Sequence, residues 1–255
     1  MRKKNALILL AGGRGKRMGS DIPKQFLDIG GEPLISRSLK TIQKSDLIDE
    51  CILVSGADDI AAIRDIVDRG GFDKVSHIVT GGAERYLSVV NGVLAICEKS
   101  GCEAFDGKPE VILIHDGARP FLDDEIIKRC LDNVSEDQGC VAAVPTKDTV
   151  KIADENGIVT DEPPRKNVWL MQTPQCFTTD VIYKACLAAK KDYEDSKQNK
   201  DIKLPEITDD AQMVKMYLGT KIKLVMGSYD NIKITTPEDI QLAEKILEAK
   251  IGHIS

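Results

Sequence analysis

The chain has 255 residues, with 35 basic and 41 acidic side chains and a formal net charge of −6. A net negative charge provides no field that attracts a polyanion, so the composition argues against binding to nucleic acid or to an anionic membrane surface. Aromatic residues make up only 4% of the chain, too few for the stacking surfaces of a single-strand binder. Any phosphate site must therefore be local.

The beginning of the chain carries only a short apolar segment. Residues 6–11 form it, and six residues are too few for a signal-peptide core or a membrane span, so we expect a cytoplasmic protein. The seven cysteines are scattered without a C-x-x-C pair, and only three histidines are present. This pattern fits neither a disulfide framework nor a zinc site, so we expect reduced cysteines that pack in the core.

Short apolar runs alternate with segments of helical spacing over the first part of the chain. The runs have the length of buried strands and lie at residues 6–10, 51–55, 75–80, 111–115 and 140–144. Helices are predicted between them at residues 33–43, 59–68, 87–98 and 123–134. This alternation predicts an α/β fold with a Rossmann-like, doubly wound and mostly parallel sheet. Ligands of such sheets bind beyond the carboxyl ends of the strands, here the loops after Leu10, Thr80, His115 and Val144.

Residues 145–168 break this alternation. Strand-like pieces at residues 149–152 and 158–160 flank the turn Asp154-Glu155-Asn156-Gly157, and Asn-Gly is a strong hairpin signal. An isolated hairpin is marginally stable in water, so we expect this projecting β-hairpin arm to pack on another surface, such as a second subunit. The absence of a linker or an internal repeat predicts one domain over residues 1–255, with the arm inside it.

The last part of the chain again mixes helices and strands. We expect a helix at residues 179–190, a polar mobile loop at 192–205 and, after Thr208-Asp209-Asp210, a helical stretch to Tyr217. Short strands are predicted at residues 222–226 and 232–234. Thr236-Pro237-Glu238-Asp239 has the features of a helix start, because it combines a Thr N-cap, a first-turn Pro and first-turn acids.

The most informative segment follows the first predicted strand and reads Leu10-Ala11-Gly12-Gly13-Arg14-Gly15-Lys16-Arg17-Met18-Gly19. Small residues let backbone N–H groups approach phosphate oxygens closely. The segment is not a P-loop, because Arg17 follows Lys16, and not a dinucleotide fingerprint, because Met18 replaces the third glycine. Arg17 and Lys24 together suggest a clamp on a polyphosphate; the alternative is solvated charge beside a tight turn.

A second polar segment, His115-Asp116-Gly117-Ala118-Arg119-Pro120, ends the fourth predicted strand at the same edge of the sheet. Mg²⁺ prefers carboxylate and phosphate oxygens, so Asp116 is a candidate metal ligand. Arg119 is either a site residue or a structural partner of Asp116. For His115 we expect a half-buried position at the end of the strand.

Eight blocks of sequence follow one another in order over nearly the whole chain. They are Ala11-Gly12-Gly13-x-Gly15-x-Arg17-Met18, Pro23-Lys24-Gln25, Gly81-Gly82-x-Glu84-Arg85-x-x-Ser88-Val89, His115-Asp116-x-Ala118-Arg119-Pro120, Asp148-Thr149-Val150-Lys151, Thr173-Pro174-Gln175, Ile207-Thr208-Asp209-Asp210 and Asn231-Ile232-Lys233. In these blocks the chain resembles the cytidylyltransferases of sugar-alcohol phosphates, most closely the 2-C-methyl-D-erythritol 4-phosphate cytidylyltransferases of the non-mevalonate isoprenoid pathway.

The resemblance implies transfer of CMP from CTP to the polyol phosphate, with release of pyrophosphate and with Mg²⁺ as cofactor. It implies that three cations surround the reacting phosphate as catalytic residues: Arg17, Lys24 and Lys233. It implies nucleotide binding, largely by backbone groups, at Ala11, Gly12, Gly13, Gly15, Gly82, Ala83, Ser88 and Asp116. Asp116 would also meet the metal.

The polyol phosphate is expected at Thr149, Arg165, Thr173, Thr208 and Arg119. The resemblance implies a homodimer in which Thr149 and Arg165 arrive on the arm of the partner subunit. Three departures from the family pattern are Ala83, where many relatives have an acidic residue, Gly117, which replaces a common alanine, and the longer stretch at residues 195–206.

Chemistry of this kind needs no general base. A phosphate monoester has its second pKa near ~6 and is mostly dianionic at pH 7, so catalysis is expected to consist of positioning and charge neutralisation. Three alternatives stay open: a D-ribitol-5-phosphate cytidylyltransferase, a nucleotide-binding regulatory protein without turnover, and a nucleotidyltransferase that uses ATP or GTP. The blocks at residues 148–151 and 207–210 favour methylerythritol over ribitol, and residues 81–89 favour cytidine.

Overall fold

The computed structural model describes residues 4–13, 22–98 and 108–252. The first elements alternate as predicted: β1 (Asn5–Ala11), α1 (Leu34–Lys44), β2 (Glu50–Ser55), α2 (Ile60–Gly70), β3 (Val75–Thr80), α3 (Arg85–Glu98), β4 (Val111–Asp116), α4 (Asp124–Leu131) and β5 (Gln138–Pro145). The later ones are β6 (Ile152–Ala153), β7 (Val159–Asp161), β8 (Trp169–Thr178), α5 (Thr179–Gln198), α6 (Asp210–Leu218), β9 (Lys221–Met226) and α7 (Pro237–Gly252). Short 3-10 turns are η2 (Lys24–Phe26), η3 (Ala57–Asp59) and η4 (Arg165–Asn167).

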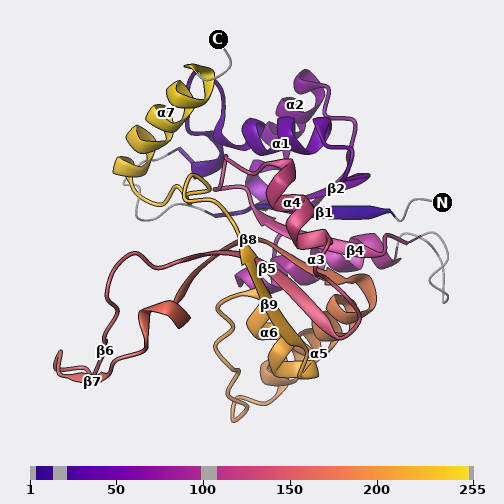
Figure 1. Cartoon of the computed structure of the whole chain (residues 1–255). Helices are drawn as coiled ribbons and strands as arrows, with labels where there is room; N and C mark the ends of the chain where they lie inside the picture. The colour runs from indigo at the N-terminus through magenta and orange to yellow at the C-terminus, as the bar shows by residue number, and fades with distance from the viewer. Residues whose placement is uncertain (1–3, 14–21, 99–107, 253–255) are drawn as a thin grey trace.

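Seven strands form the central sheet in the order β3-β2-β1-β4-β8-β5-β9. All neighbouring pairs are parallel except those of β8, which runs antiparallel to both β4 and β5. The mostly parallel, doubly wound α/β fold predicted from the sequence is thereby confirmed (Figure 1).

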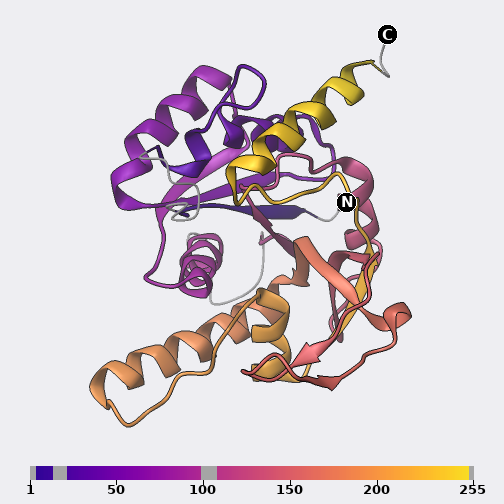
Figure 2. The ribbon, with the colours of Figure 1, turned by 90° about the vertical axis from the view of Figure 1, so that its left-hand side faces the viewer.

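Helices cover both faces of this sheet because its central strands are apolar on both sides. In β1, Ala6 and Ile8 pack with α3, α5 and α6 on one face, whereas Leu7 and Leu9 pack with α1, α2 and α4 on the other. All four side chains are fully buried, as expected for a strand between two helical layers. Figure 2 shows the two layers, with α5 leading away from the sheet. Helix α7 packs on a separate cluster that contains Ile234 and Ala243.

Strand β8 was not predicted from the sequence. Its residues include the polar side chains of Gln172, Thr173 and Gln175, which hide the apolar pattern of a buried strand. All three are nevertheless buried, and each has hydrogen-bond partners within the fold. Local periodicity could not reveal these partners, because they lie far away in the sequence.

Two further expectations about the second half are wrong. The predicted mobile loop at residues 192–205 is helical in its first half, because α5 continues to Gln198. There Asp192 accepts a hydrogen bond from the hydroxyl of Tyr217, so its polar side chain is part of the packing between α5 and α6. Residues 232–234 form no strand; the Ile234 N–H instead donates to the carbonyl of Ala118 at 2.9 Å.

The predicted hairpin is present and projects from the body of the molecule (Figure 1). Strands β6 and β7 pair antiparallel around a turn in which Asp154 Oδ1 accepts from the N–H groups of Asn156 and Ile158. Gly157 has φ of +79°, a left-handed conformation that suits glycine. Apolar side chains of the arm remain exposed, including Ile158 at 64%.

The cysteines of the described ranges lie in the core. The six cysteines within the described ranges are free and buried, which confirms the prediction of packing residues for them; Cys102 lies outside these ranges. Among the described helices, none combines the length and the apolar character that crossing a bilayer requires.

Candidate active site

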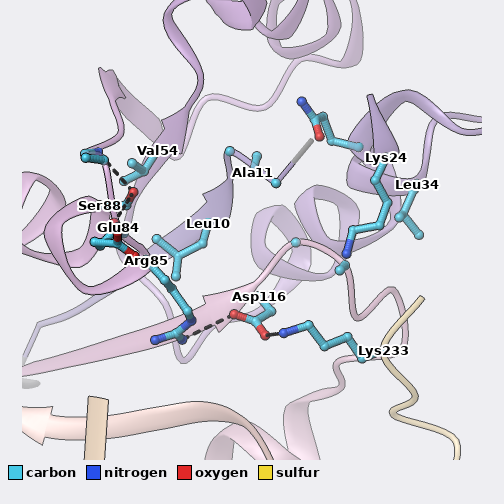
Figure 3. A pocket seen from close by; sticks show the side chains of 17 residues that line it. Leu10, Ala11, Lys24, Leu34, Val54, Glu84, Arg85, Ser88, Asp116 and Lys233 are labelled. Atoms are coloured by element: carbon cyan, nitrogen blue, oxygen red, sulfur yellow. Dashed lines mark hydrogen bonds and ion pairs between the residues drawn. The ribbon is translucent and has the colours of Figure 1, made fainter. Parts of the chain in front are cut away.

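A cavity of about 310 Å³ lies at the carboxyl edge of the sheet. Its walls come from the loop after β1, from η2, from the turn between β3 and α3, from the loop after β4 and from the segment before α7 (Figure 3). The loops after Leu10, Thr80 and His115 therefore form a ligand-sized site, as the sequence predicts. The loop after Val144 instead leads into the arm, and its residues are not among the described ones that line the cavity.

The described start of the glycine-rich segment, Ala11–Gly13, forms one wall of the cavity. A Cβ on Gly12 would lie 3.6 Å from the backbone nitrogen of Gly56, and Gly13 faces open space. Backbone groups of this turn are therefore accessible to an anion. Gly15 and Arg17, which the sequence assigns to the phosphates, lie outside the described residues.

Lys24 reaches the cavity from η2, on the other side of this turn (Figure 3). The neighbouring Gln25 is 4% exposed and donates through Nε2 to Asp59 Oδ2 at 2.9 Å. This partly buried contact fixes η2 against the end of η3, just before α2. The turn that carries Lys24 is thus anchored beside the glycine-rich turn, with Pro23 before it.

The turn between β3 and α3 forms the wall expected to read the base. The Gly82 N–H donates to Ser88 Oγ at 3.1 Å, and Ser88 Oγ donates to the Glu84 carbonyl at 3.3 Å. A Cβ on Gly82 would lie 2.3 Å from Leu87 Cβ, so only glycine fits there. Ala83 is exposed and lines the cavity beside them.

Asp116, at the end of β4, lies between two cations. Its Oδ2 is 2.6 Å from Lys233 Nζ, and its Oδ1 is 3.3 Å from Arg85 Nη2. Burial by itself would raise the pKa of Asp116, but the charges of Arg85 and Lys233 outweigh burial and hold this pKa well below its usual range. The carboxylate is therefore anionic at neutral pH and available to a metal ion or a hydroxyl group.

Arg85 is the functional candidate that sequence reasoning missed. Its guanidinium pairs with both oxygens of Asp210, with Nη1–Oδ1 and Nη2–Oδ2 distances of 2.9 Å. Burial opposes the charge of Arg85, but Asp210 and Asp116 outweigh it and raise the pKa, so the side chain stays cationic. The block that contains Arg85 marks it only as part of a motif, because its carboxylate partner is 125 positions away in the sequence.

His115 and Thr173 fix the backbone on which Asp116 sits. The Asp116 N–H donates to Thr173 Oγ1 at 3.1 Å, Thr173 Oγ1 lies 2.9 Å from His115 Nδ1, and His115 Nε2 lies 3.0 Å from the Arg119 carbonyl. Since a carbonyl only accepts, the proton of His115 is assigned to Nε2, and the hydroxyl of Thr173 donates to Nδ1. His115 is fully buried rather than half-buried as expected, and burial lowers its pKa to about 4.

The residues predicted for the polyol phosphate are not gathered at the described walls of the cavity. Arg119 is 9% exposed and donates to the carbonyls of Asn231 and Met171, so it ties β8 to the segment before α7. Thr208 is exposed and bonds to Gln212 Oε1 through its N–H and Oγ1.

Thr149 and Arg165 are exposed on the arm. The fold thus brings together those predicted nucleotide residues that lie within the described ranges, with Lys24 and Lys233 beside them. It leaves the arm residues free to act at another surface. The roles of the whole predicted acceptor set stay predictions.

A cavity at the carboxyl edge of a doubly wound sheet, lined by a glycine-rich turn and by cations around one buried carboxylate, has the features expected of one class of enzyme, the nucleotidyltransferases. The comparisons specify the family. The family model for 2-C-methyl-D-erythritol 4-phosphate cytidylyltransferase matches residues 5–249. The enzyme of this name from Geobacter metallireducens is 43% identical over 245 residues, which cover 96% of this chain and 97% of the relative.

Another relative and a solved structure are also similar to this chain. The protein of the same name from Lachnospira eligens is 43% identical over 239 residues, covering 94% of this chain and 97% of the relative. The crystal structure of 4-diphosphocytidyl-2C-methyl-D-erythritol synthase from Anaerococcus prevotii has a TM-score of 0.76 at 32% identity and covers 96% of each chain. This chain belongs to the 2-C-methyl-D-erythritol 4-phosphate cytidylyltransferase family.

The burial of neutral His115 predicts a pH-dependent stability. The unfolded chain protonates this imidazole near pH 6.5, whereas the folded chain does so only near pH 4. Unfolding therefore takes up a proton between these values, so the free energy of unfolding rises from pH 4 to pH 6.5, by up to about 3 kcal/mol from this group. Urea unfolding at several pH values measures the slope for the wild type and for His115→Gln. The variant is expected to have a shallower slope, and equal slopes would contradict the assignment.

Proposed function

We propose that this protein transfers CMP from CTP to 2-C-methyl-D-erythritol 4-phosphate and releases pyrophosphate and 4-diphosphocytidyl-2-C-methyl-D-erythritol. The observation that carries the proposal is the family match over residues 5–249, which includes all of the described residues that line the cavity. The reaction would supply an isoprenoid precursor of the non-mevalonate pathway. We place it in the cytoplasm and in one domain over residues 1–255.

The reacting groups are both anionic, and the cavity is arranged to reduce their repulsion. An oxygen of the acceptor phosphate attacks the α-phosphorus of CTP, and the bond from that phosphorus to pyrophosphate breaks. The acceptor is already mostly dianionic at neutral pH, so the main task is charge neutralisation and alignment. Lys24 and Lys233 approach the cavity from separate segments and supply positive charge there. Arg17 is proposed as a third cation on the triphosphate.

We infer that Asp116 helps to hold Mg²⁺ together with the triphosphate. The residues support this in two ways: Asp116 lines the cavity, and its lowered pKa keeps it anionic. Within the described ranges no group of three or more His, Cys, Asp or Glu side chains could hold a metal by itself, and Mg²⁺ is commonly bound by one or two carboxylates plus substrate phosphates. When bound, the ion would neutralise phosphate charge and orient the triphosphate.

We further infer a homodimer in which the arm of one subunit completes the acceptor site of the other. Thr149 and Arg165 are exposed on an arm that projects from its own subunit. Ile152, Ile158 and Val159 on the same arm expose between 49% and 64% of their surface. Exposed apolar surface on a two-stranded hairpin is better accounted for by a partner than by water.

The acceptor is tested by direct comparison. We expect pyrophosphate release from CTP to be faster with 2-C-methyl-D-erythritol 4-phosphate than with D-ribitol 5-phosphate, by at least roughly tenfold in kcat/KM, because a site that pairs with the substrate hydroxyls discriminates against a mismatched set. CTP should exceed ATP and GTP in the same assay. Faster turnover of ribitol phosphate would favour the alternative acceptor, and tight CTP binding without any turnover would favour a regulatory protein.

Removal of either lysine is expected to abolish most turnover. In comparable phosphoryl transfers one cation contributes about 10³ to 10⁵ in rate, so Lys24→Ala and Lys233→Ala should each lower kcat by about 10³-fold while circular dichroism shows a folded protein. Lys40→Ala is the matched control, since Lys40 is an exposed residue of α1 and pairs with Glu32, which lies just before that helix. Near-normal turnover in both lysine variants would show that the cations are misassigned.

The dimer is tested on the arm itself. Ile158→Asp should increase the dissociation constant of the dimer by at least roughly tenfold, because a charge would be buried without a partner, and activity should fall in parallel with dimer content. Sedimentation at several protein concentrations measures the change. Leu242→Asp, at an exposed apolar position of α7 (46% exposed), serves as the control. A wild type that is monomeric at all concentrations, or a variant that dimerises as the wild type does, would refute the arm as the interface.

A further inference from the structure

Arg85 connects three separate segments at the base of the cavity. It begins α3, directly after the turn that contains Gly82 and Ala83. Its guanidinium pairs with both oxygens of Asp210, and Nη2 also lies 3.3 Å from Asp116 Oδ1. Figure 3 shows it approaching Asp116 from the side opposite Lys233. The turn that faces the nucleotide, the end of β4 and the start of α6 therefore share one cation.

The Asp210 end of this bridge is rigid. Asp210 is fully buried in the first turn of α6, whose N-cap Asp209 accepts from the N–H of Gln212 at 2.7 Å. Gln175 of β8 reinforces this helix start, because its Oε1 accepts from the Ala211 N–H at 2.8 Å and its Nε2 donates to Asp209 at 3.2 Å. A planar guanidinium held on both oxygens of a fixed carboxylate has a defined orientation.

The two cations at Asp116 differ in how firmly they are held. Lys233 Nζ sits at the end of a flexible chain whose side chain is 39% exposed, and the proposed reaction needs this ammonium at the phosphate. Arg85 is held by Asp210 and cannot move to the phosphate with Lys233. When Lys233 turns to the triphosphate, Arg85 is the partner that stays with the Asp116 carboxylate.

We propose that Arg85, anchored by Asp210, is a positioning residue that keeps the Asp116 carboxylate oriented toward the metal and the nucleotide while Lys233 engages the phosphate. The inference rests on the proposed function, since it takes Asp116 as the residue that meets the metal with CTP. It gives Arg85 no contact with the reacting atoms. A purely structural role would cross-link the same three segments and would affect folding alone.

The test uses variants that separate positioning from folding. Replacing Arg85 alone would leave Asp210 buried and unpaired, whereas apolar replacement of both partners is often tolerated. The first variant is therefore Arg85→Met combined with Asp210→Leu. The second is Arg85→Lys, which keeps the charge but loses the planar fork. Arg37→Met is the control, because Arg37 also pairs with a carboxylate, Glu32, at 3.3 Å.

Two measurements are made on each full-length protein. Calorimetry gives the dissociation constant of CTP with and without Mg²⁺, and pyrophosphate release gives kcat, both KM values and the Mg²⁺ concentration for half-maximal rate. Loss of a residue that orients a metal-binding carboxylate typically weakens metal binding or activity by roughly 10–100-fold. For the double variant we expect the affinity for CTP in the presence of Mg²⁺ to fall by that factor. For Arg85→Lys we expect this affinity to fall by at least roughly fivefold. Arg37→Met, and the KM for the acceptor in all variants, should stay within about twofold of the wild type.

Several results would overturn the proposal. One is a folded double variant whose Mg²⁺-dependent CTP binding is within about twofold of the wild type. Another is a loss confined to the KM of the acceptor, which would place Arg85 at that substrate. If the double variant does not fold, Arg85→Lys is used instead. Mg²⁺-dependent CTP binding within about twofold of the wild type in that variant would then overturn the proposal. Failure of the proposed function is seen separately, as a wild type that binds CTP but releases no pyrophosphate with the methylerythritol acceptor.

Discussion

The carboxylate of Asp116, held between Arg85 and Lys233, is the interaction on which the candidate site depends. A buried charge without partners is costly, and in a partly desolvated cavity a paired one acts on its neighbours more strongly than in water. Its two cations come from the start of α3 and from the segment before α7, which lie far apart in the sequence. The charge pattern of the cavity therefore exists only when both segments are in place.

The sheet provides the frame for this arrangement. Strands β1 and β4 are parallel neighbours, so the glycine-rich turn and Asp116 emerge at one edge. Strand β8 enters between β4 and β5 in the opposite direction and contributes Thr173, whose hydroxyl accepts from the Asp116 N–H. Buried polar groups of this kind need complete partnerships. Here a series of hydrogen bonds that runs from Asp116 through Thr173 and His115 to the Arg119 carbonyl supplies these partners.

The apolar strands are the part of the fold that follows most directly from the sequence. Strands β1, β2 and β4 were predicted because each is a continuous apolar run, and burial on both faces follows directly from that composition. Strand β8 and the end of α5 were missed because their polar residues find partners on distant elements, such as Tyr217 for Asp192. The cavity wall expected to bind the nucleotide was predicted from motifs, whereas the contact of Arg85 with Asp210 has no local signature.

The sequence by itself determined the fold class, the projecting arm and the family, because apolar periodicity, the Asn-Gly turn and ordered motifs are local properties of the chain. It also identified Lys24, Asp116 and Lys233 as residues of one site. Only the tertiary structure decided how these charges are paired, which of the cations at Asp116 is fixed, and that His115 is buried and neutral. Such pairings join segments that lie between 31 and 125 positions apart in the sequence, and no local pattern records them.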